Sequence, residues 1–338
     1  MRVLKAALTA TVSAAVIGLM AGCSGSGSSI NSITPGPQMH SSIQRDGTGV
    51  APKYLSLLKF GQALPHAVPM STSAPRYLAV SDFGTGAVEI LNSSYALHQT
   101  ITTGLSGPDG DWYDQPGNLY VANYAGPYVQ EYALHATSPS FTYSSGLGDP
   151  ITVTTDENGN VYVGDYNFGG AGFINEYAQG SNTVVNSCSP GGAVEGVAVG
   201  ETGKVFVDYN NPNTGSANIA EYPTGLAGCH ERVLAPVLGF AGGMQIANNR
   251  DLVVCDQFGP TVDVIDPPYT SITTTIGPGY ADPFHVALNK SNGLMFVADP
   301  GDAVVWVQDY PSGSVVTTLG AGSGLSDPAG VATFPNQH

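Results

Sequence analysis

The chain has 338 residues with 44 Gly, 24 Pro and 17 Tyr, only 11% of its residues are charged, and its formal net charge is −16. Many turn-forming residues and few charges favour short strands joined by tight turns and argue against long helices. Because so acidic a surface repels a phosphate backbone, we expect no nucleic-acid partner.

Residues 1–22 have the layout of an export signal. Two basic residues precede an apolar run that ends at Met20 and is too short to span a bilayer. The run leads into Ala21-Gly22-Cys23, which resembles a bacterial lipobox. The resemblance implies that Cys23 carries the lipid (palmitate among its acyl chains). We therefore expect an envelope lipoprotein that touches the membrane only through its anchor, at the outer membrane where the host has one. The alternative is an ordinary signal peptide with an incidental cysteine.

The segment after the leader divides into two parts. Residues 23–53 are rich in Ser, Gly and Pro without apolar periodicity, which predicts a flexible tether. Residues 54–75 contain a short apolar piece that either docks on the domain or forms an amphipathic turn, and the sequence leaves this choice open. The folded domain is expected over residues 76–338.

One pattern recurs from residue 76 onward, a short apolar strand that ends at Asp or Asn. It occupies residues 78–82, 119–123, 161–165, 205–209, 252–256 and 295–299, with starts about 41 to 47 residues apart. A Gly- or Asn-rich loop, a second alternating strand, a Thr- and Val-rich strand and a fourth strand complete each repeat. Four strands in about 43 residues match one blade of a β-propeller.

The two ends of the domain give the number of blades. Residues 328–334 match an innermost strand but no blade follows them, whereas the first repeat lacks its innermost strand. Joining the two closes a ring and removes unpaired sheet edges. The sequence therefore predicts an all-β fold, a six-bladed β-propeller of four-stranded blades closed by the C-terminal strand.

The order of strand, Gly-Asn turn and strand ending in Asp resembles NHL-repeat six-bladed propellers over about residues 76–336. The resemblance implies this fold, which also carries regucalcin-like lactonases, amidating lyases, strictosidine-synthase-like proteins and plain binding scaffolds. Function must therefore be argued from the sites. Amidating lyases place several histidines at the channel, whereas only His285 is expected on an innermost strand here.

Three cysteines remain in the domain. Cys188 and Cys229 are expected on outer strands of adjacent repeats, so a disulfide between them is favoured in an export compartment. Cys255 lies in an apolar strand and is expected to be a buried free thiol. No Cys-x-x-Cys or His/Cys spacing indicates a zinc site.

A polar group is expected where the innermost strands begin, at one end of the central channel. It consists of Asp109, Glu195, Gln245 and His285. Two carboxylates, an amide and an imidazole could hold a divalent cation or act as general acid and base. The alternative is an ordinary polar channel lining, which we favour because the neighbouring positions supply no further ligands.

Aromatic residues gather on the same face, after the strand-ending Asp or Asn. They are Phe83, Tyr124, Tyr166, Phe168, Tyr209 and Phe258. Rigid rings beside amide groups suit a sugar or peptide surface. The alternative is that the rings pack between blades and hold the loops.

Two further acidic series recur in the repeats. Asp82, Asp165, Asp256 and Asp299 end their strands and are expected to cap the following loops. Glu131, Glu176, Glu221 and Asp266 recur every 45 residues and are expected on a solvated strand face.

Together these features predict a non-enzymatic, envelope-anchored propeller whose loop face binds a protein, peptide or glycan, without a cofactor. The alternative prediction is a divalent-metal-dependent hydrolase, lactonase or lyase that uses Asp109, Glu195 and His285.

Overall fold

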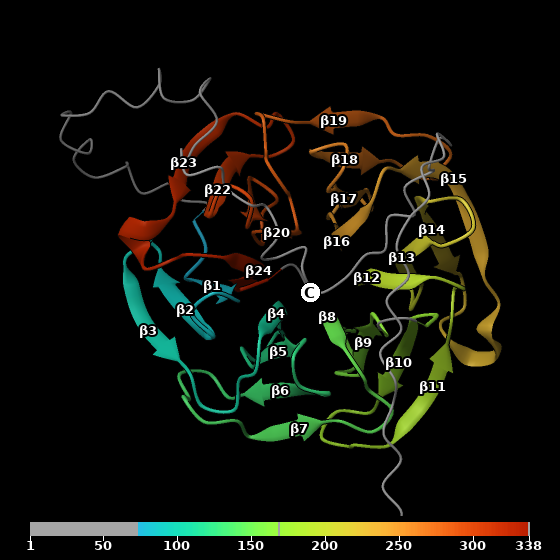
Figure 1. Ribbon diagram of the computed structural model, residues 1–338, viewed down its shortest axis with the longest axis horizontal. Coiled ribbons are helices and arrows are strands. Elements are labelled where there is room, and N and C mark those ends of the chain that lie inside the picture. Colours follow the sequence, from blue (N-terminus) through green and yellow to red (C-terminus); the bar gives the residue numbers. More distant parts are fainter. Residues whose placement is uncertain (1–73, 168–169, 337–338) are drawn as a thin grey trace, which may run out of the picture. The chain divides into compact units, whose positions relative to one another are not determined.

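The domain is a ring of six four-stranded antiparallel sheets in the computed structural model, which describes residues 74–167 and 170–336 (Figure 1). This confirms the predicted all-β six-bladed propeller. In the described residues the helical content is limited to short 3-10 turns, among them η2 (Ala227–Cys229) and η3 (Ala321–Ser323).

The innermost strand of each blade lies nearest the centre of the ring. These strands are β4 (Pro108–Tyr113), β8 (Pro150–Thr155), β12 (Ala193–Val199), β16 (Ala241–Ile246), β20 (His285–Leu288) and β24 (Pro328–Phe334). The second strands are β1 (Tyr77–Asp82), β5 (Leu119–Asn123), β9 (Val161–Asp165), β13 (Val205–Asn211), β17 (Leu252–Asp256) and β21 (Leu294–Asp299).

Two more strands complete each blade toward the rim. The third strands are β2 (Ala87–Asn92), β6 (Tyr128–Tyr132), β10 (Phe173–Tyr177), β14 (Ser216–Tyr222), β18 (Thr261–Ile265) and β22 (Val304–Asp309). The outer strands are β3 (Leu97–Ile101), β7 (Phe141–Tyr143), β11 (Val184–Cys188), β15 (Arg232–Leu238), β19 (Thr274–Ile276) and β23 (Val315–Leu319). We number the blades 1 to 6 from the one that holds β1.

Blade 1 takes its innermost strand from the C-terminal end of the chain. Its sheet order is β24-β1-β2-β3, whereas the other five blades are built from four consecutive strands. β24 pairs antiparallel with β1, with Tyr77 opposite Phe334 and Val80 opposite Val331. The predicted ring closure is therefore confirmed, and this pairing gives β1 a hydrogen-bonded partner on each side, β24 and β2.

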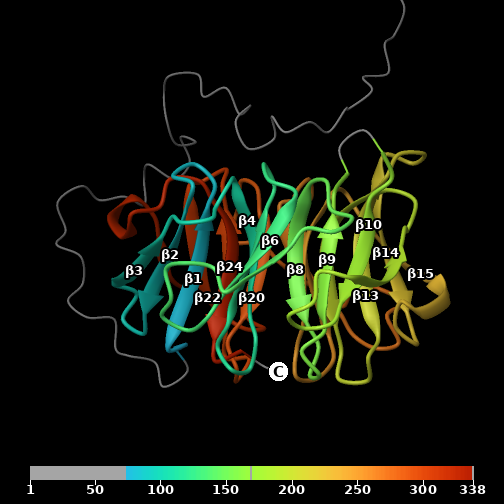
Figure 2. The same cartoon turned by 90° about the horizontal axis from the view of Figure 1, so that it is seen from below.

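The strands run between two faces of the ring (Figure 2). On the first, which we call the mouth face, the second strands end and the innermost strands begin. On the second, the hairpin face, tight turns join innermost to second strands. Asp114 and Asp156 organise two of these turns, since each carboxylate accepts backbone N–H bonds from the residues that follow. Asp156 thus caps a hairpin, as such turns commonly require.

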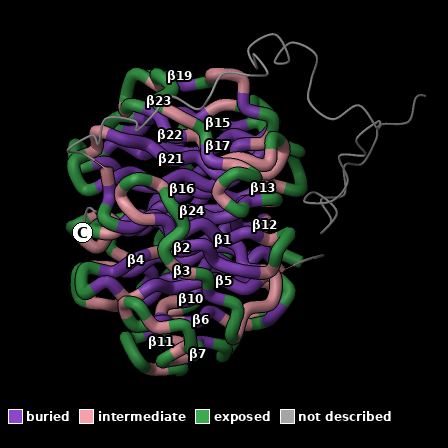
Figure 3. Tube along the Cα trace, turned by 90° about the vertical axis from the view of Figure 1, so that its left-hand side faces the viewer, coloured by how far each residue is buried: buried purple, intermediate pink, exposed green. Residues whose placement is uncertain are grey.

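The core lies between adjacent blades, where the buried strands form the interior and the exposed turns lie at its margins (Figure 3). The final residue of the third strand in blades 2, 3 and 4 is a fully buried tyrosine: Tyr132, Tyr177 and Tyr222. The hydroxyls of Tyr132 and Tyr177 donate to backbone carbonyls of the preceding blade, at Thr103 and Ser145. Each of the three rings therefore fills space in the core, and those of Tyr132 and Tyr177 also tie two blades together.

The cysteines of the domain lie on blades 3, 4 and 5. Cys188 of β11 is joined to Cys229 by a disulfide with a Cα–Cα distance of 5.5 Å, and Cys255 is a buried free thiol. Cys229 lies in η2, before β15, and not on the outer strand where the sequence placed it. The reason is that a 3-10 turn interrupts the chain between β14 and β15.

Ring closure should depend on one buried carboxylate. Asp82 at the end of β1 accepts backbone N–H bonds from Ser326 (2.5 Å) and Asp327 (3.3 Å), which lead into β24. We expect Asp82→Ala to lower the free energy of unfolding by about 2 to 3 kcal/mol, because it leaves these donors without their acceptor. Urea denaturation measures the change.

The control is Glu157→Ala, which removes an exposed carboxylate from the turn between β8 and β9 and should cost less than about 0.5 kcal/mol. Equal losses for the two variants would show that Asp82 has no special part in closing the ring.

Candidate functional site

The mouth face is organised by acidic and amide side chains at the ends of the second strands. The loop entering the innermost strand donates backbone N–H groups to this side chain in blade after blade. Asp165 accepts from Gly148 and Asp149, and Asp299 accepts from Ala281 and Asp282. The acceptors at this position include Asp82, Asn123, Asp165, Asp256 and Asp299. These carboxylates are used in loop structure, as the sequence predicted for the series.

Blade 4 departs from this pattern, and the sequence interpretation of it was wrong. β13 continues past Asp208 to Asn211, so that Asp208 pairs with Gly196 and Asn210 pairs with Ala193. Asn210 therefore occupies the strand-end position, while Asp208 lies fully buried inside the sheet. Tyr209 is part of the strand, only 4% exposed, and it packs in the core between blades. It does not belong to the mouth surface.

Three of the predicted aromatic residues form a row around the mouth. The ring of Tyr124 lies 6.5 Å from that of Phe83 and 6.3 Å from that of Tyr166, between ring centroids. Tyr166 is buried in an apolar cluster with Ile151 and Phe284, at the start of the innermost strands, and the half-buried Phe83 and Tyr124 pack against this cluster. We call Phe83, Tyr124 and Tyr166 the aromatic row. Such tilted contacts are favourable between rings.

Phe258 lies apart from this row. It belongs to blade 5, its side chain is 51% exposed, and its ring contacts Phe240 at 4.9 Å between centroids. Phe168, which the sequence also placed on this surface, lies outside the described residues. The sequence thus predicted one aromatic surface, whereas in the structure the described rings lie in three places: at the mouth, in the core and on blade 5.

Carboxylates surround the aromatic row. Asp109 and Glu195 are buried on β4 and β12, and partly exposed aspartates precede three other innermost strands. We call the five residues Asp109, Asp149, Glu195, Asp282 and Asp327 the mouth carboxylates. Burial raises the pKa of Tyr124 to about 12, and the charges of Asp149, Asp109 and Glu195 add to this. The ring of Tyr124 therefore lies within the field of these acids.

The sequence interpretation missed three of the mouth carboxylates. Each is the first residue of an Asp-Pro dipeptide at the entrance to an innermost strand, at Asp149, Asp282 and Asp327. Pro150 and Pro328 fix the backbone at the first position of β8 and β24, where a missing N–H is tolerated, and Pro283 lies just before β20. The repeated Asp-Pro dipeptide was the signal that could have found them.

Asp109 and Glu195 lie near each other, as the sequence predicted. Burial raises the pKa of both carboxyls well above the ordinary value, and the charge of Asp109 raises that of Glu195 further. Asn210 donates to the Glu195 carboxylate at 2.9 Å, which opposes the shift without cancelling it. Two carboxyls whose pKa values are raised in this way bind protons more readily than exposed acids and could exchange them with a bound group.

His285 and Gln245 lie in the channel below the mouth. Together with other residues of the innermost strands they line a cavity of about 10 Å³, room for about one water. A Cβ on Gly243 would lie 2.2 Å from the His285 ring, so only glycine fits there. Burial lowers the pKa of His285 to about 4, which leaves the imidazole neutral at pH 7.

Gln245 is occupied by structure, and its predicted place at the mouth was wrong. It lies opposite Val253 near the hairpin end of β16, because the pairing of β16 with β17 shifts register after Ala241. Its side-chain oxygen accepts the backbone N–H of Leu288 at 2.5 Å, which joins blade 5 to blade 6. The side chain therefore serves inter-blade contact.

A metal site of three or more His, Cys, Asp or Glu side chains is not found in residues 74–167 and 170–336. Nor does this part of the chain contain a helix long and apolar enough to cross a membrane. Cys23, the tether over residues 23–53 and residues 54–73 lie outside the described residues, so the predictions made for them stay predictions.

Comparisons with known proteins show the fold alone. A solved structure described as a nidogen/laminin complex aligns with a TM-score of 0.61 at 15% identity, covering 76% of this chain and 97% of that one. A protein of unknown function from Bacteroides caccae aligns with a TM-score of 0.58 at 13% identity, covering 78% of this chain and 100% of its own. One from Desulfotomaculum acetoxidans DSM 771 gives 0.56 at 13%, with 76% and 98% covered. No family model and no curated protein sequence matches the chain.

Stability should fall as the pH rises above 6.5. Burial, with the charges of Asp299 and Asp327, raises the pKa of Asp282 to about 7, whereas an aspartate in an unfolded chain titrates near 4. The folded state thus favours the protonated form, and that stability is present at low pH and lost as the pH rises through about 7. His285 acts in the opposite sense, but only below about pH 6.5.

We therefore expect the melting temperature to fall between pH 6.5 and 8, and to fall less in Asp282→Asn. Glu157→Gln, which changes an exposed carboxyl on the hairpin face, should keep the parent pH dependence. A melting temperature that is constant or rises over this interval would contradict the assignment.

Proposed function

We propose that the mouth face binds a protein or peptide partner through a basic segment of that partner. The observation that carries the proposal is the aromatic row with five mouth carboxylates around it. An aromatic ring attracts a cation to its face, and carboxylates add direct charge complementarity. Lysine and arginine side chains offer both a cation and an apolar stem that can lie along the rings.

The charge of the whole chain supports a basic partner. A net charge of −16 steers cations toward the protein and repels anions. The aromatic rings would also suit a neutral glycan, but a glycan carries no positive charge to interact with the mouth carboxylates. For that reason the peptide proposal is preferred to the glycan proposal, which becomes an outcome of the test.

Binding of a cation should be coupled to proton release. Burial raises the pKa values of Asp109 and Glu195, so these carboxyls bind protons more readily than exposed acids while the mouth is empty. A bound ammonium or guanidinium favours their charged forms and so lowers both pKa values. Affinity for a basic segment should then increase as the pH rises.

The structural comparisons fit a binding role without assigning it. A propeller neighbour belongs to a structure described as a nidogen/laminin complex, which is an assembly of proteins. At 15% identity this similarity supports the fold and says nothing of the partner here. Membership among the NHL-repeat propellers is likewise a proposal that rests on the sequence pattern.

The alternative of a divalent-metal hydrolase, lactonase or lyase stays untested. It required Asp109, Glu195 and His285 to act together, and His285 lies in the channel against Gly243. No observation in the described part of the chain favours this alternative over binding.

The binding proposal predicts that two substitutions at the mouth weaken capture of a basic peptide. Octalysine is titrated into the purified chain at 0.15 M salt, with octaglutamate and cellohexaose as other probes. We expect Tyr124→Ser to weaken octalysine about fivefold through the lost cation–π contact. Asp149→Asn should weaken it about twofold to fivefold through the lost charge.

The control for charge is Glu157→Gln, which removes the same charge from the hairpin face of the same blade. The control for exposed rings is Phe258→Ser, outside the aromatic row. Neither should change the affinity. Equal weakening by Asp149→Asn and Glu157→Gln would mean that octalysine binding depends only on the net charge of the protein. If cellohexaose bound more tightly than octalysine, the peptide proposal would be replaced by a glycan site.

We further propose that the chain is held at the cell envelope by lipid on Cys23. The support is the leader followed by Ala21-Gly22-Cys23. Two or more acyl chains anchor a protein firmly, since burial contributes about 0.8 kcal/mol per CH₂. Metabolic labelling with an alkyne fatty acid should mark the protein, and Cys23→Ser should lose the label and move from the membrane to the soluble fraction. A labelled Cys23→Ser protein would contradict the anchor.

A further inference from the structure

A second site opens on the hairpin face, between blades 4 and 5. It is a cavity of about 350 Å³, within the range of small-molecule sites. The turn before β13, the turn before β17 and the segment after β18 enclose it. The space found at the same face between blades 1 and 2 measures only about 20 Å³.

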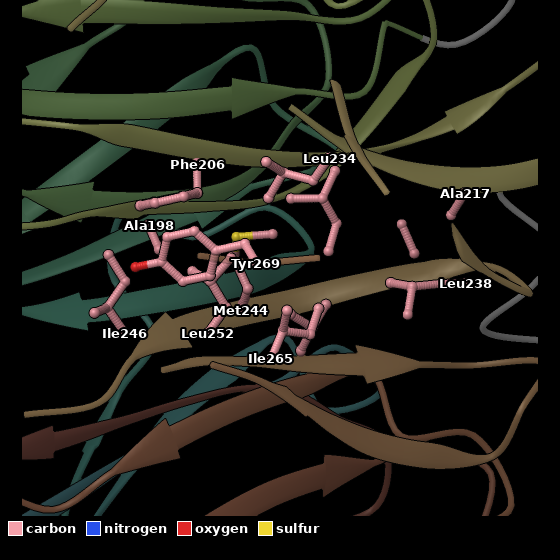
Figure 4. Close-up of a cluster of buried hydrophobic side chains, with 13 residues drawn as sticks. Ala198, Phe206, Ala217, Leu234, Leu238, Met244, Ile246, Leu252, Ile265 and Tyr269 are labelled. Carbon is pink, nitrogen blue, oxygen red and sulfur yellow. The ribbon is translucent and has the colours of Figure 1, made fainter. Parts of the chain in front are cut away.

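The walls of the cavity are largely apolar. Phe206, Ile246 and Tyr269 belong to the buried core between blades 4 and 5, where Figure 4 draws them together. The rings of Phe206 and Tyr269 are 5.0 Å apart and nearly perpendicular. Pro267 and Pro268 complete this side. Such walls would accept a flat apolar group.

The strand-final position that holds a buried tyrosine in blades 2, 3 and 4 holds an aliphatic residue in blade 5. Ile265 occupies the place of the strand-final tyrosines in blades 2 to 4, opposite the first residue of the second strand. It has no hydroxyl with which to reach the preceding blade, as Tyr132 and Tyr177 do. The larger opening lies at this blade junction.

The cavity also gathers the scarce cations of the chain. The described residues include five lysines and arginines, namely Arg76, Lys204, Arg232, Arg250 and Lys290. Three of them, Lys204, Arg232 and Arg250, line this cavity, against two acids, Glu201 and Glu221. The lining therefore carries one net positive charge in a protein whose net charge is −16.

A buried carboxylate fixes two of these cations in place. Glu221 is 1% exposed, which corrects the expectation of a solvated strand face. It accepts a 2.8 Å bond from Lys204 and bonds from Arg232. Burial alone would raise the pKa of Glu221, but the bonds and charges of these partners hold it below its ordinary value. The side chains of Lys204 and Arg232 remain 40% and 56% exposed, so both can serve a ligand.

Arg250 lies at the rim of the cavity. No ion pair engages its guanidinium within residues 74–167 and 170–336, while its backbone carbonyl accepts the hydroxyl of Tyr269 at 2.9 Å. Arg250 and Tyr269 adopt positive φ, 73° and 64°, which is uncommon for residues with such side chains. The turn that carries the third cation is therefore tied by its backbone to Tyr269 of the apolar wall.

From this geometry we infer that the cavity between blades 4 and 5 binds a small organic anion, such as an aromatic carboxylate. In this proposal the apolar body of the ligand lies against Phe206, Ile246 and Tyr269, and its acid group meets Arg250 with support from Lys204 and Arg232. This site lies on the face opposite the mouth and is independent of the function proposed for the mouth.

The test titrates the purified chain with 2-naphthoate by calorimetry at pH 7 and 0.15 M salt, and with 2-naphthalenemethanol as the uncharged analogue. We expect one naphthoate per chain and at least about tenfold weaker binding of the alcohol, because charged hydrogen bonds discriminate to this degree. Arg250→Asn should weaken naphthoate about tenfold, and asparagine accepts the left-handed backbone of this turn.

Two further variants test separately whether binding depends on net charge and whether it depends on the open volume of the cavity. Lys290→Gln removes one positive charge from the corresponding turn of blade 6, outside the cavity, and should leave the affinity unchanged. Thr202→Trp adds a ring at the exposed rim of the cavity without changing charge and should abolish binding. The inference is overturned if naphthoate does not bind, if the alcohol binds as tightly, if Arg250→Asn and Lys290→Gln weaken it equally, or if Thr202→Trp binds normally.

Discussion

The pairing of β24 with β1 is the constraint on which the rest of the molecule depends. It makes the last strand of the chain the innermost strand of the first blade, so that the ring has no free end. A propeller blade buries its faces only against its neighbours, and an open ring would expose two such faces. Asp82 strengthens the junction by binding the loop that leads into β24. The mouth exists because closure brings six innermost strands to one axis.

Polar groups near the axis divide into those that build the ring and those that remain for a ligand. The strand-end carboxylates are saturated by backbone N–H groups of the loops. Gln245 joins neighbouring blades through the backbone of Leu288. The mouth carboxylates lie on the innermost strands or directly before them, and Asp149, Asp282 and Asp327 among them are partly exposed. The second strands thus carry the acids that build the loops, and the innermost strands carry the acids proposed for a partner.

Two sites of opposite character occupy opposite faces. The mouth combines rings with acids, whereas the cavity between blades 4 and 5 combines rings with cations. Both use irregularities in an otherwise repeating fold. Asp-Pro dipeptides supply acids at the entrances to three innermost strands, and blade 5 has Ile265 where blades 2, 3 and 4 have a strand-final tyrosine. A repeat fold offers the same positions many times, and substitution at one of them creates a site without disturbing the others.

The sequence by itself determined the blade number, the four-strand repeat, the closing strand and the capping aspartates, because these follow from local periodicity and from turn chemistry repeated along the chain. Tertiary structure decided what depends on register and on side chains brought together from different blades. Asp208 and Tyr209 are core residues because β13 extends beyond the apolar residues that mark this strand in the sequence. Glu221 became buried because Lys204 and Arg232 neutralise it. Pairing between distant segments fixes such contacts, and no local pattern records them.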